Sequence, residues 1–213
     1  MWLSPPGCLI FSTLVRHAHA LNARAPVVFV QYLVALAAVR AIKTYAPGCA
    51  ALPVRLKWPN DIYARDAATG AYAKVGGVLV NSAFAGGAFS LVVGVGLNVA
   101  NGAPTLTLDA LAGVAFSAER LLARILVVFE EMYLRFCAAG WAPFEDMYYA
   151  EWLHSGQVVA LEMEGGVQAR IVGITREWGM LKVQELQGGR TWELMSDGNS
   201  FDFFKGLLRR KEP

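Results

Sequence analysis

The spacing of hydrophobic residues changes along the chain, and this spacing predicts where strands and helices form. Short apolar runs bounded by glycine, proline or polar residues predict buried strands. Two of these runs flank Gly86-Gly87, a dipeptide that favours a tight turn, so they predict a β-hairpin. The strands predicted in this first part of the chain are residues 9–15, 54–58, 75–83 and 89–97.

Other segments have the apolar spacing of helices. Residues 27–46 are apolar at most positions, which predicts a mostly buried helix. Residues 118–139 carry apolar side chains at helical spacing and charged ones on the opposite side. Ser117 is the predicted cap of this second helix and Gly140 its terminator. The remaining predictions are a short helix over residues 143–152 and a loop over residues 64–73.

After Ser155 the pattern changes, because glycines become frequent and the apolar runs become short. The predicted strands here are residues 158–163, 167–175, 180–185 and 191–195. Several short strands separated by glycine turns are typical of a small β-barrel. The sequence therefore predicts an α+β domain over residues 1–153, followed by a small barrel over residues 154–213.

Composition indicates a globular protein. Apolar residues make up 55% of the chain and charged residues 17%, which excludes a disordered polypeptide. Residues 76–100 lack charged side chains and are long enough to cross a bilayer, yet they contain six glycines, including a central pair. Two buried strands joined by a turn explain this pattern better than a membrane helix does. We therefore expect no membrane partner.

Charge and cysteine content narrow the partners and the compartment. The formal net charge is only +2, and the basic run at residues 209–211 is too short for a nucleic-acid footprint. We therefore expect no nucleic-acid partner. Cys8, Cys49 and Cys137 are odd in number and lack metal-ligand spacing, which favours a reducing intracellular compartment. We expect a cytoplasmic protein, with the mitochondrion as the alternative location.

The candidate chemistry lies in three motifs between residues 57 and 98. Lys57-Trp58-Pro59-Asn60-Asp61 brings a cation, an amide and a carboxylate together where proline restricts the backbone. Lys74-Val75-Gly76-Gly77 follows, where missing Cβ atoms let a ligand lie against the backbone beside a cation. The third motif is Gly94-Val95-Gly96-Leu97-Asn98. The structural alternatives are a strand-edge lysine and an Asn-Asp turn for the first motif and a β-bulge for the second. The third motif lacks the third glycine and the following helix of a dinucleotide fingerprint, which excludes that interpretation.

In this order the three motifs resemble the catalytic core of biotin protein ligases. The segment 196–202, Ser-Asp-Gly-Asn-Ser-Phe-Asp, makes the likeness greatest to the eukaryotic holocarboxylase synthetases. The resemblance starts at Trp2, downstream of the arginine- and glycine-rich loop and the Ser-Thr-Asn segment of that family. It implies a class II synthetase-like α+β core, with a mixed sheet and packed helices, followed by an SH3-like barrel.

The resemblance also implies roles for individual residues. Lys74 would contact the biotin carboxylate and offset the charge that develops at the α-phosphorus. Asp61 and Lys57 would be catalytic with it, Asp61 by orienting either the attacking lysine amine or a lysine at the site. Asn60 would help to hold phosphate or metal. Biotin or its adenylate would also contact Trp2, Gly76 and Gly77, and the adenine base would contact Asn98.

The reaction implied by the resemblance has two steps. Biotin and Mg-ATP form biotinyl-5′-AMP and pyrophosphate, and a lysine amine then attacks the mixed anhydride. The implied cofactors are ATP and Mg²⁺, with biotin as substrate, and the implied partners are biotin-acceptor domains of carboxylases and a second copy in a homodimer. Two alternatives are a non-catalytic relative that binds acceptor domains, and a lipoate or octanoate ligase on the same fold.

Overall fold

The computed structural model describes residues 5–102, 105–196, 199–202 and 205–210. The chain forms two compact units, Met1–Glu151 and Trp152–Pro213. The first unit contains the three motifs and is described first.

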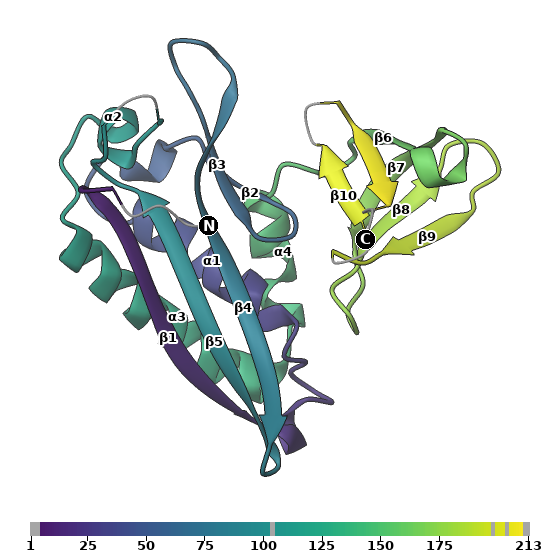
Figure 1. Cartoon of the computed structure of the whole chain (residues 1–213), viewed down its shortest axis with the longest axis horizontal. Helices are drawn as coiled ribbons and strands as arrows, with labels where there is room; N and C mark the ends of the chain where they lie inside the picture. The colour runs from purple at the N-terminus through teal and green to yellow at the C-terminus, as the bar shows by residue number, and fades with distance from the viewer. Residues whose placement is uncertain (1–4, 103–104, 197–198, 203–204, 211–213) are drawn as a thin grey trace. The chain divides into compact units, whose positions relative to one another are not determined.

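The first unit is built on a five-stranded sheet in the order β1-β5-β4-β3-β2 (Figure 1). All four strand pairings in it are antiparallel. Gly86 and Gly87, with φ of +57° and +73°, form the turn of the predicted β4–β5 hairpin. The strands are β1 (Cys8–Ala18), β2 (Val54–Lys57), β3 (Asp61–Arg65), β4 (Tyr72–Ala85) and β5 (Ala88–Asn98).

One segment differs from the prediction. Residues 64–73 are not a single loop, because the segment contains the end of β3 and the start of β4. The pattern was uninformative here because β3 is short and buries only Ile62 and Ala64. As a result, Asp61 begins β3 and pairs with Lys57 across a β2–β3 hairpin.

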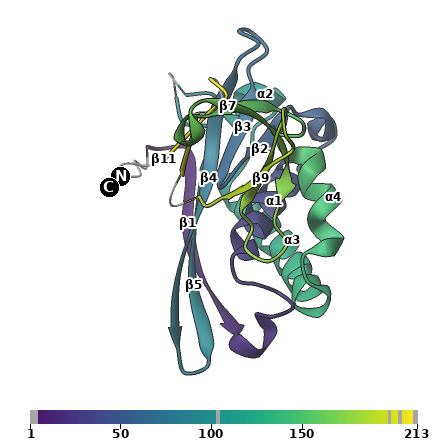
Figure 2. The same cartoon turned by 90° about the vertical axis from the view of Figure 1, so that its right-hand side faces the viewer.

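Helices cover one face of this sheet (Figures 1 and 2). Helix α1 (Phe29–Lys43) packs against β4 on one side and α3 (Ala118–Ala139) on the other, so it is buried nearly all round, as predicted. None of the helices in the described part of the chain combines the length and apolar character needed to cross a bilayer. The other helices are α4 (Ala142–Glu151) and α2 (Leu108–Ala112), a single short turn that the sequence pattern did not predict.

The ends of α3 follow the predicted signals. The Ser117 hydroxyl accepts a hydrogen bond from the Arg120 amide at 3.2 Å, which satisfies one free donor of the first turn. Gly140 ends the helix with φ of +71°, and a Cβ there would lie 2.6 Å from the Arg24 carbonyl oxygen. Only glycine fits this position without moving the backbone.

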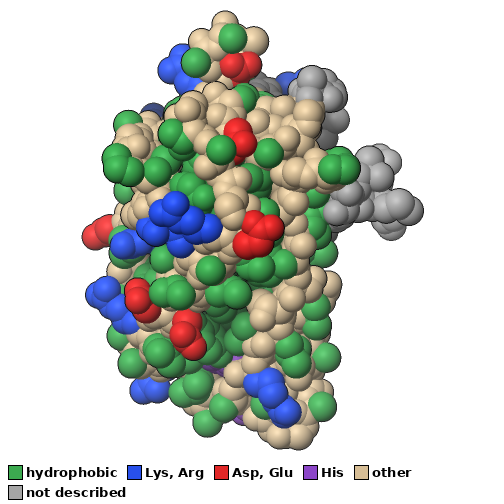
Figure 3. All heavy atoms as spheres, turned by 90° about the vertical axis from the view of Figure 1, so that its left-hand side faces the viewer, with side chains coloured by type: hydrophobic (Ala, Val, Ile, Leu, Met, Phe, Trp, Pro, Cys, Tyr) green, Lys and Arg blue, Asp and Glu red, His purple; other side chains and the backbone are tan. Residues whose placement is uncertain are grey.

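The two faces of the sheet differ in character. On β5, Leu91, Val93, Val95 and Leu97 point toward the helices and are buried. The residues between them point to the other face, which we call the open face because α1, α3 and α4 do not cover it. Figure 3 shows the side of the molecule that lies at the left of Figure 1, where hydrophobic side chains are mixed with acidic and basic ones.

The second unit contains a six-stranded sheet in the order β10-β11-β6-β7-β8-β9. The β11–β6 pairing is parallel and the others are antiparallel, so this sheet is mixed. The predicted α+β class is confirmed. Closure of a barrel stays a prediction, since no pairing among the described residues joins β9 to β10. The strands are β6 (Val158–Leu161), β7 (Val167–Ile174), β8 (Leu181–Glu185), β9 (Thr191–Leu194), β10 (Asn199–Asp202) and β11 (Leu207–Arg210).

Candidate functional site

The first motif forms the turn between β2 and β3, and the core holds this turn in place. Trp58 is only 1% exposed, and its indole Nε1 donates a hydrogen bond to the Tyr32 hydroxyl of α1 at 3.0 Å. The Asn60 carbonyl accepts from the Val78 amide of β4 at 2.8 Å. The turn is thereby tied to a helix and to a neighbouring strand, which fixes the strand ends on either side of it.

Asp61, Lys57 and Lys74 form an ionic cluster at these strand ends. The Lys74 Nζ lies 2.5 Å from Asp61 Oδ1, and the Lys57 Nζ lies 3.8 Å from Asp61 Oδ2. The Lys57 and Asp61 side chains are only 13% and 16% exposed, whereas that of Lys74 is 53% exposed. With two cations and one anion, the cluster has a formal charge of +1. Lys74 is therefore the cation best placed to meet an anionic ligand.

A β-bulge in β4 places Lys74 beside Asp61. Ile62 of β3 pairs with Gly76, but the next residue, Tyr63, pairs with Lys74, so Val75 is an extra residue in β4. Bulges of this kind bend a strand and re-aim the side chains next to them. The bulge that was the structural alternative for this motif is therefore present, and it sits within the cluster.

Gly76 and Gly77 lack side chains for different reasons. A Cβ on Gly76 would lie 2.5 Å from the Gly96 carbonyl oxygen and 2.5 Å from Leu97 Cδ2, on the helix-covered side. A Cβ on Gly77 would point the other way, 3.3 Å from Asp61 Oδ1 and 3.6 Å from Lys74 Cε. Gly77 therefore belongs to the site on the open face, and the glycine at position 76 is required by strand packing.

The register of the sheet aligns four residues in one row across the open face. Asp61 pairs with Gly77, Gly77 with Gly96, and Gly96 with Ile10. Directly paired residues point to the same face of a sheet, so two glycines separate the ionic cluster from Ile10. With adjacent strands ~4.8 Å apart, this row spans about 14 Å. Its middle is a floor without side chains, on which a ligand can lie against the backbone.

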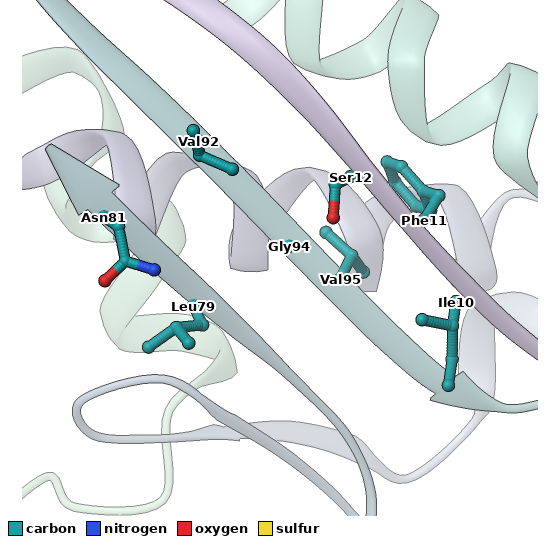
Figure 4. Close-up of a pocket in the computed structure, with 8 residues that line it drawn as sticks. All are labelled: Ile10, Phe11, Ser12, Leu79, Asn81, Val92, Gly94 and Val95. Carbon is teal, nitrogen blue, oxygen red and sulfur yellow. The ribbon is translucent and has the colours of Figure 1, made fainter. Parts of the chain in front are cut away.

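A cavity of about 260 Å³ adjoins this floor (Figure 4). It lies over β5, between side chains of β1 and β4, and most of its lining is apolar. Ser12 and Asn81 supply the polar side chains of the lining. The complete lining is Ile10, Phe11, Ser12, Leu79, Asn81, Val92, Gly94 and Val95. A pocket that is mainly apolar, with a few polar groups, is typical of a small-molecule site.

Asn98 ends β5 next to this site. Its side-chain Nδ2 lies 3.5 Å from the Lys74 carbonyl oxygen, and its Oδ1 accepts from Asn101 Nδ2 at 3.2 Å. The structure thus brings together Lys57, Asp61, Lys74 and Gly77, with Asn98 at one side. Asn60 contributes its main-chain carbonyl to the turn, and the role of its side chain stays a prediction. Trp2 lies outside the described residues.

This arrangement suits an elongated ligand with an anionic group at one end. The anion would meet Lys74, the middle of the ligand would cross Gly77 and Gly96, and an apolar part would enter the cavity beyond them. Fixed cations of this kind lower the cost of bringing two anionic reactants together.

Comparison with known proteins shows which of them this chain resembles. Residues 1–98 match the model of the Biotin/lipoate A/B protein ligase family. The biotin–protein ligase of Schizosaccharomyces pombe is 37% identical over 99% of this chain and 37% of its own length. Biotin–protein ligase 1, chloroplastic, of Arabidopsis thaliana is 38% identical over 99% of this chain and 58% of its own length. The chain is thus similar to biotin–protein ligases along nearly its whole length.

Solved structures share the fold of this chain. The biotin protein ligase of Aquifex aeolicus, in a structure titled as a complex with biotin and ATP, matches 99% of this chain and 82% of its own chain. The TM-score is 0.69 at 24% sequence identity. The chain spans less than two thirds of the length of the curated relatives it matches.

Sequence reasoning did not find the cavity or Asn101. The cavity residue Ser12 lies on β1, and Leu79 and Asn81 lie on β4. Both strands pair with β5, and no local motif reveals the register of these pairings. One signal was available, because Leu79 follows Gly77 by two residues and therefore points to the same face of β4. Asn101 gave no such signal, since it lies in a loop after β5.

Proposed function

We propose that this chain activates biotin with ATP and transfers it to a lysine of an acceptor protein. The observation that carries the proposal is the row on the open face, where the ionic cluster lies at one end of a glycine floor and Ile10, which lines the adjoining apolar cavity, lies at the other. Similarity to relatives named biotin–protein ligases suggests the chemical class.

In the first step, a carboxylate oxygen of biotin attacks the α-phosphorus of ATP, and pyrophosphate leaves. Both reactants are anions, so the step needs positive charge where they meet. The Lys74 ammonium supplies this charge, and its contact with Asp61 at 2.5 Å holds it at the end of the glycine floor. The bicyclic part of biotin occupies the cavity that Leu79 and Ile10 line.

In the second step, the neutral amine of an acceptor lysine attacks the carbonyl carbon of biotinyl-5′-AMP. The bond from this carbon to the phosphate oxygen breaks, AMP leaves, and the amine passes its proton to water or to a group near Asp61. Asp61 supplies the carboxylate of the ionic cluster, and its proposed role is to orient the incoming amine. The acceptor is a biotin-carrier domain of a carboxylase.

Magnesium enters the proposal together with ATP. No group of three or more His, Cys, Asp and Glu side chains that could hold a metal occurs in the part of the chain that the structure describes. Mg²⁺ commonly binds through one or two carboxylates and substrate phosphates. The residues present fit an ion held mainly by the phosphates, with Asn60 and Asp61 as the nearest oxygen donors. A cytoplasmic location and a homodimer stay predictions.

Biotin-dependent exchange of pyrophosphate into ATP tests the proposal, because it reports the first step without an acceptor. We expect exchange by the purified chain and a loss of about 100-fold or more in Lys74→Ala, since a charge-stabilising group in the site is removed. Lys182→Ala, an exposed lysine of β8 in the second unit, is the matched control and should exchange normally.

Two results would contradict the proposal. A folded wild-type chain without exchange would show that it does not activate biotin. Exchange that depends on lipoate or octanoate, and that biotin does not affect, would make this chain a lipoate or octanoate ligase instead. Equal rates in Lys74→Ala and wild type would remove Lys74 from the reaction.

A further inference from the structure

A chain of hydrogen bonds runs from the loop after β5 to the site lysine. The Thr105 hydroxyl donates to the Gly102 carbonyl oxygen at 3.0 Å, and the same hydroxyl oxygen accepts from Asn101 Nδ2 at 3.1 Å. Asn101 Nδ2 also donates to Asn98 Oδ1 at 3.2 Å. Asn98 Nδ2 in turn points to the Lys74 carbonyl oxygen at 3.5 Å.

The two ends of this chain determine the direction of every bond in it. Both ends are main-chain carbonyl oxygens, at Gly102 and at Lys74, and a carbonyl oxygen can only accept. Thr105 must therefore donate to Gly102 and can only accept from Asn101. If either asparagine amide were turned over, two oxygens would face each other. The network thus fixes amide orientations that are otherwise interchangeable.

Asn101 is itself held firmly. Its side chain is 4% exposed, and both protons of its Nδ2 are used within the network. Among the described residues its buried Oδ1 has no hydrogen-bond partner. The backbone beside it is also constrained, because the Ala100 amide donates to the Gly7 carbonyl at 2.7 Å. A Cβ on Gly7 would lie 2.8 Å from the Asn101 amide nitrogen.

Burial of the Asn101 Oδ1 without a partner lowers the stability of the folded chain, as is usual for an unpaired buried acceptor. An apolar side chain at this position would avoid that cost but could not donate to Asn98. Unlike an apolar side chain, asparagine has an Nδ2 group that donates hydrogen bonds to both Asn98 and Thr105. The function of the residue therefore lies in what it does to Asn98.

We propose that Asn101 is a positioning residue that sets the amide of Asn98 so that an N–H donor faces the nucleotide. The inference rests on the proposed function. Asn101 donates a hydrogen bond to the Asn98 Oδ1, and Asn98 donates one of its two Nδ2 protons to the Lys74 carbonyl oxygen. The second Nδ2 proton is left to donate to a ligand. The matching ligand group is an acceptor, such as a ring nitrogen of adenine. Asn98 touches the ligand, and Asn101 acts through it.

Three variants test this role. Asn101→Asp is nearly isosteric but replaces the donor with an acceptor, so Asn98 should turn over and lose its donor to the nucleotide. Thr105→Val removes the hydroxyl that orients Asn101 without adding charge. Thr105→Ser keeps the hydroxyl and is the matched control. Thermal unfolding of each variant reports whether it is folded.

Titration calorimetry with ATP and, separately, with biotin gives the decisive comparison. We expect the Kd for ATP to rise about tenfold in Asn101→Asp, about the effect of one lost hydrogen bond to a ligand. Thr105→Val should show a smaller rise and Thr105→Ser none, and the Kd for biotin should not change in any of them. In an Asn98→Ala background, Asn101→Asp should have no further effect on ATP.

Several outcomes would overturn the inference. They are an unchanged Kd for ATP in Asn101→Asp, an equal loss for biotin, or an undiminished loss in the Asn98→Ala background. The side-chain amide resonances of Asn98 in the ligand-free protein test the positioning directly, and a signal that Asn101→Asp leaves unmoved would also overturn it. If the wild-type chain binds neither ATP nor biotin, the proposed function fails, and the Asn98 signal still decides the positioning role.

Discussion

The two faces of the five-stranded sheet carry different tasks, and adjacent residues of a single strand divide them. On β5, Val95 and Leu97 are almost completely buried against the helices. Gly94, Gly96 and Asn98 alternate with them and face the cavity and the ionic cluster. Because side chains of a strand alternate between faces, one strand both stabilises the core and floors the site. A substitution can therefore be aimed at one task with little effect on the other.

The pair Gly76 and Gly77 gives the sharpest test, and we expect the larger effect at Gly76. In Gly76→Ala the new Cβ would lie 2.5 Å from the Gly96 carbonyl oxygen and from Leu97 Cδ2, so β4 and β5 must separate locally. Overpacking of this kind lowers the free energy of unfolding by about 3 kcal/mol. Urea denaturation followed by circular dichroism measures it. An unchanged midpoint would contradict the close contact.

Gly77→Ala should leave stability nearly unchanged and weaken the chemistry. Its Cβ would lie 3.3 Å from Asp61 Oδ1 and 3.3 Å from the Asn60 carbonyl oxygen, so the carboxylate must shift by a fraction of an ångström. Because Asp61 holds the Lys74 ammonium, this shift misplaces the cation of the first step, and we expect about a tenfold loss of biotin-dependent pyrophosphate exchange.

Each alanine variant is the control for the other, since each adds one methyl group and the two positions are adjacent in β4. If Gly77→Ala lowered the denaturation midpoint as much as Gly76→Ala, the division between the faces would be wrong. If Gly77→Ala exchanged pyrophosphate at the wild-type rate, the open face would not need its bare floor at this position.

The sequence predicted the helix-covered face better than the open face. The limits of α3 followed from Ser117, Gly140 and the apolar spacing between them, because each of these signals is local. The hairpin followed from Gly86-Gly87 for the same reason. Strand β3 was missed because its five residues bury only Ile62 and Ala64, too few to show alternation.

For the site, the motifs indicated which residues matter but not how they meet. Lys57 and Asp61 are close in the sequence, and their proximity could be expected. The contact between Asp61 and Lys74 depends on a bulge at Val75, and the row through Gly96 depends on register across three strands. Register is a property of the assembled sheet, and a single sequence does not display it.

His17 provides the smallest expected effect, because it places a titratable group on the helix-covered face. The imidazole is buried, and its Nδ1 lies 2.9 Å from the Tyr133 hydroxyl of α3. Burial lowers the pKa of His17, and the carbonyl of Ala25 offsets this lowering only in part. Burial also raises the pKa of Tyr133, so this hydroxyl stays neutral near pH 7.

The sign of the pH dependence follows from the direction of that shift. Because the pKa of His17 is lower in the folded chain than in the unfolded one, the unfolded chain binds the proton more readily, and stability falls as the pH drops below about 6.5. Thermal unfolding between pH 8 and pH 5 should show this loss in the wild type and less of it in His17→Gln, which does not titrate. His19→Gln, at an exposed position in the short 3-10 helix His19–Leu21 that follows β1, is the matched control. If His17→Gln and wild type had parallel profiles, protonation of His17 would not be linked to folding, and the helix-covered face would be insensitive to pH at this position.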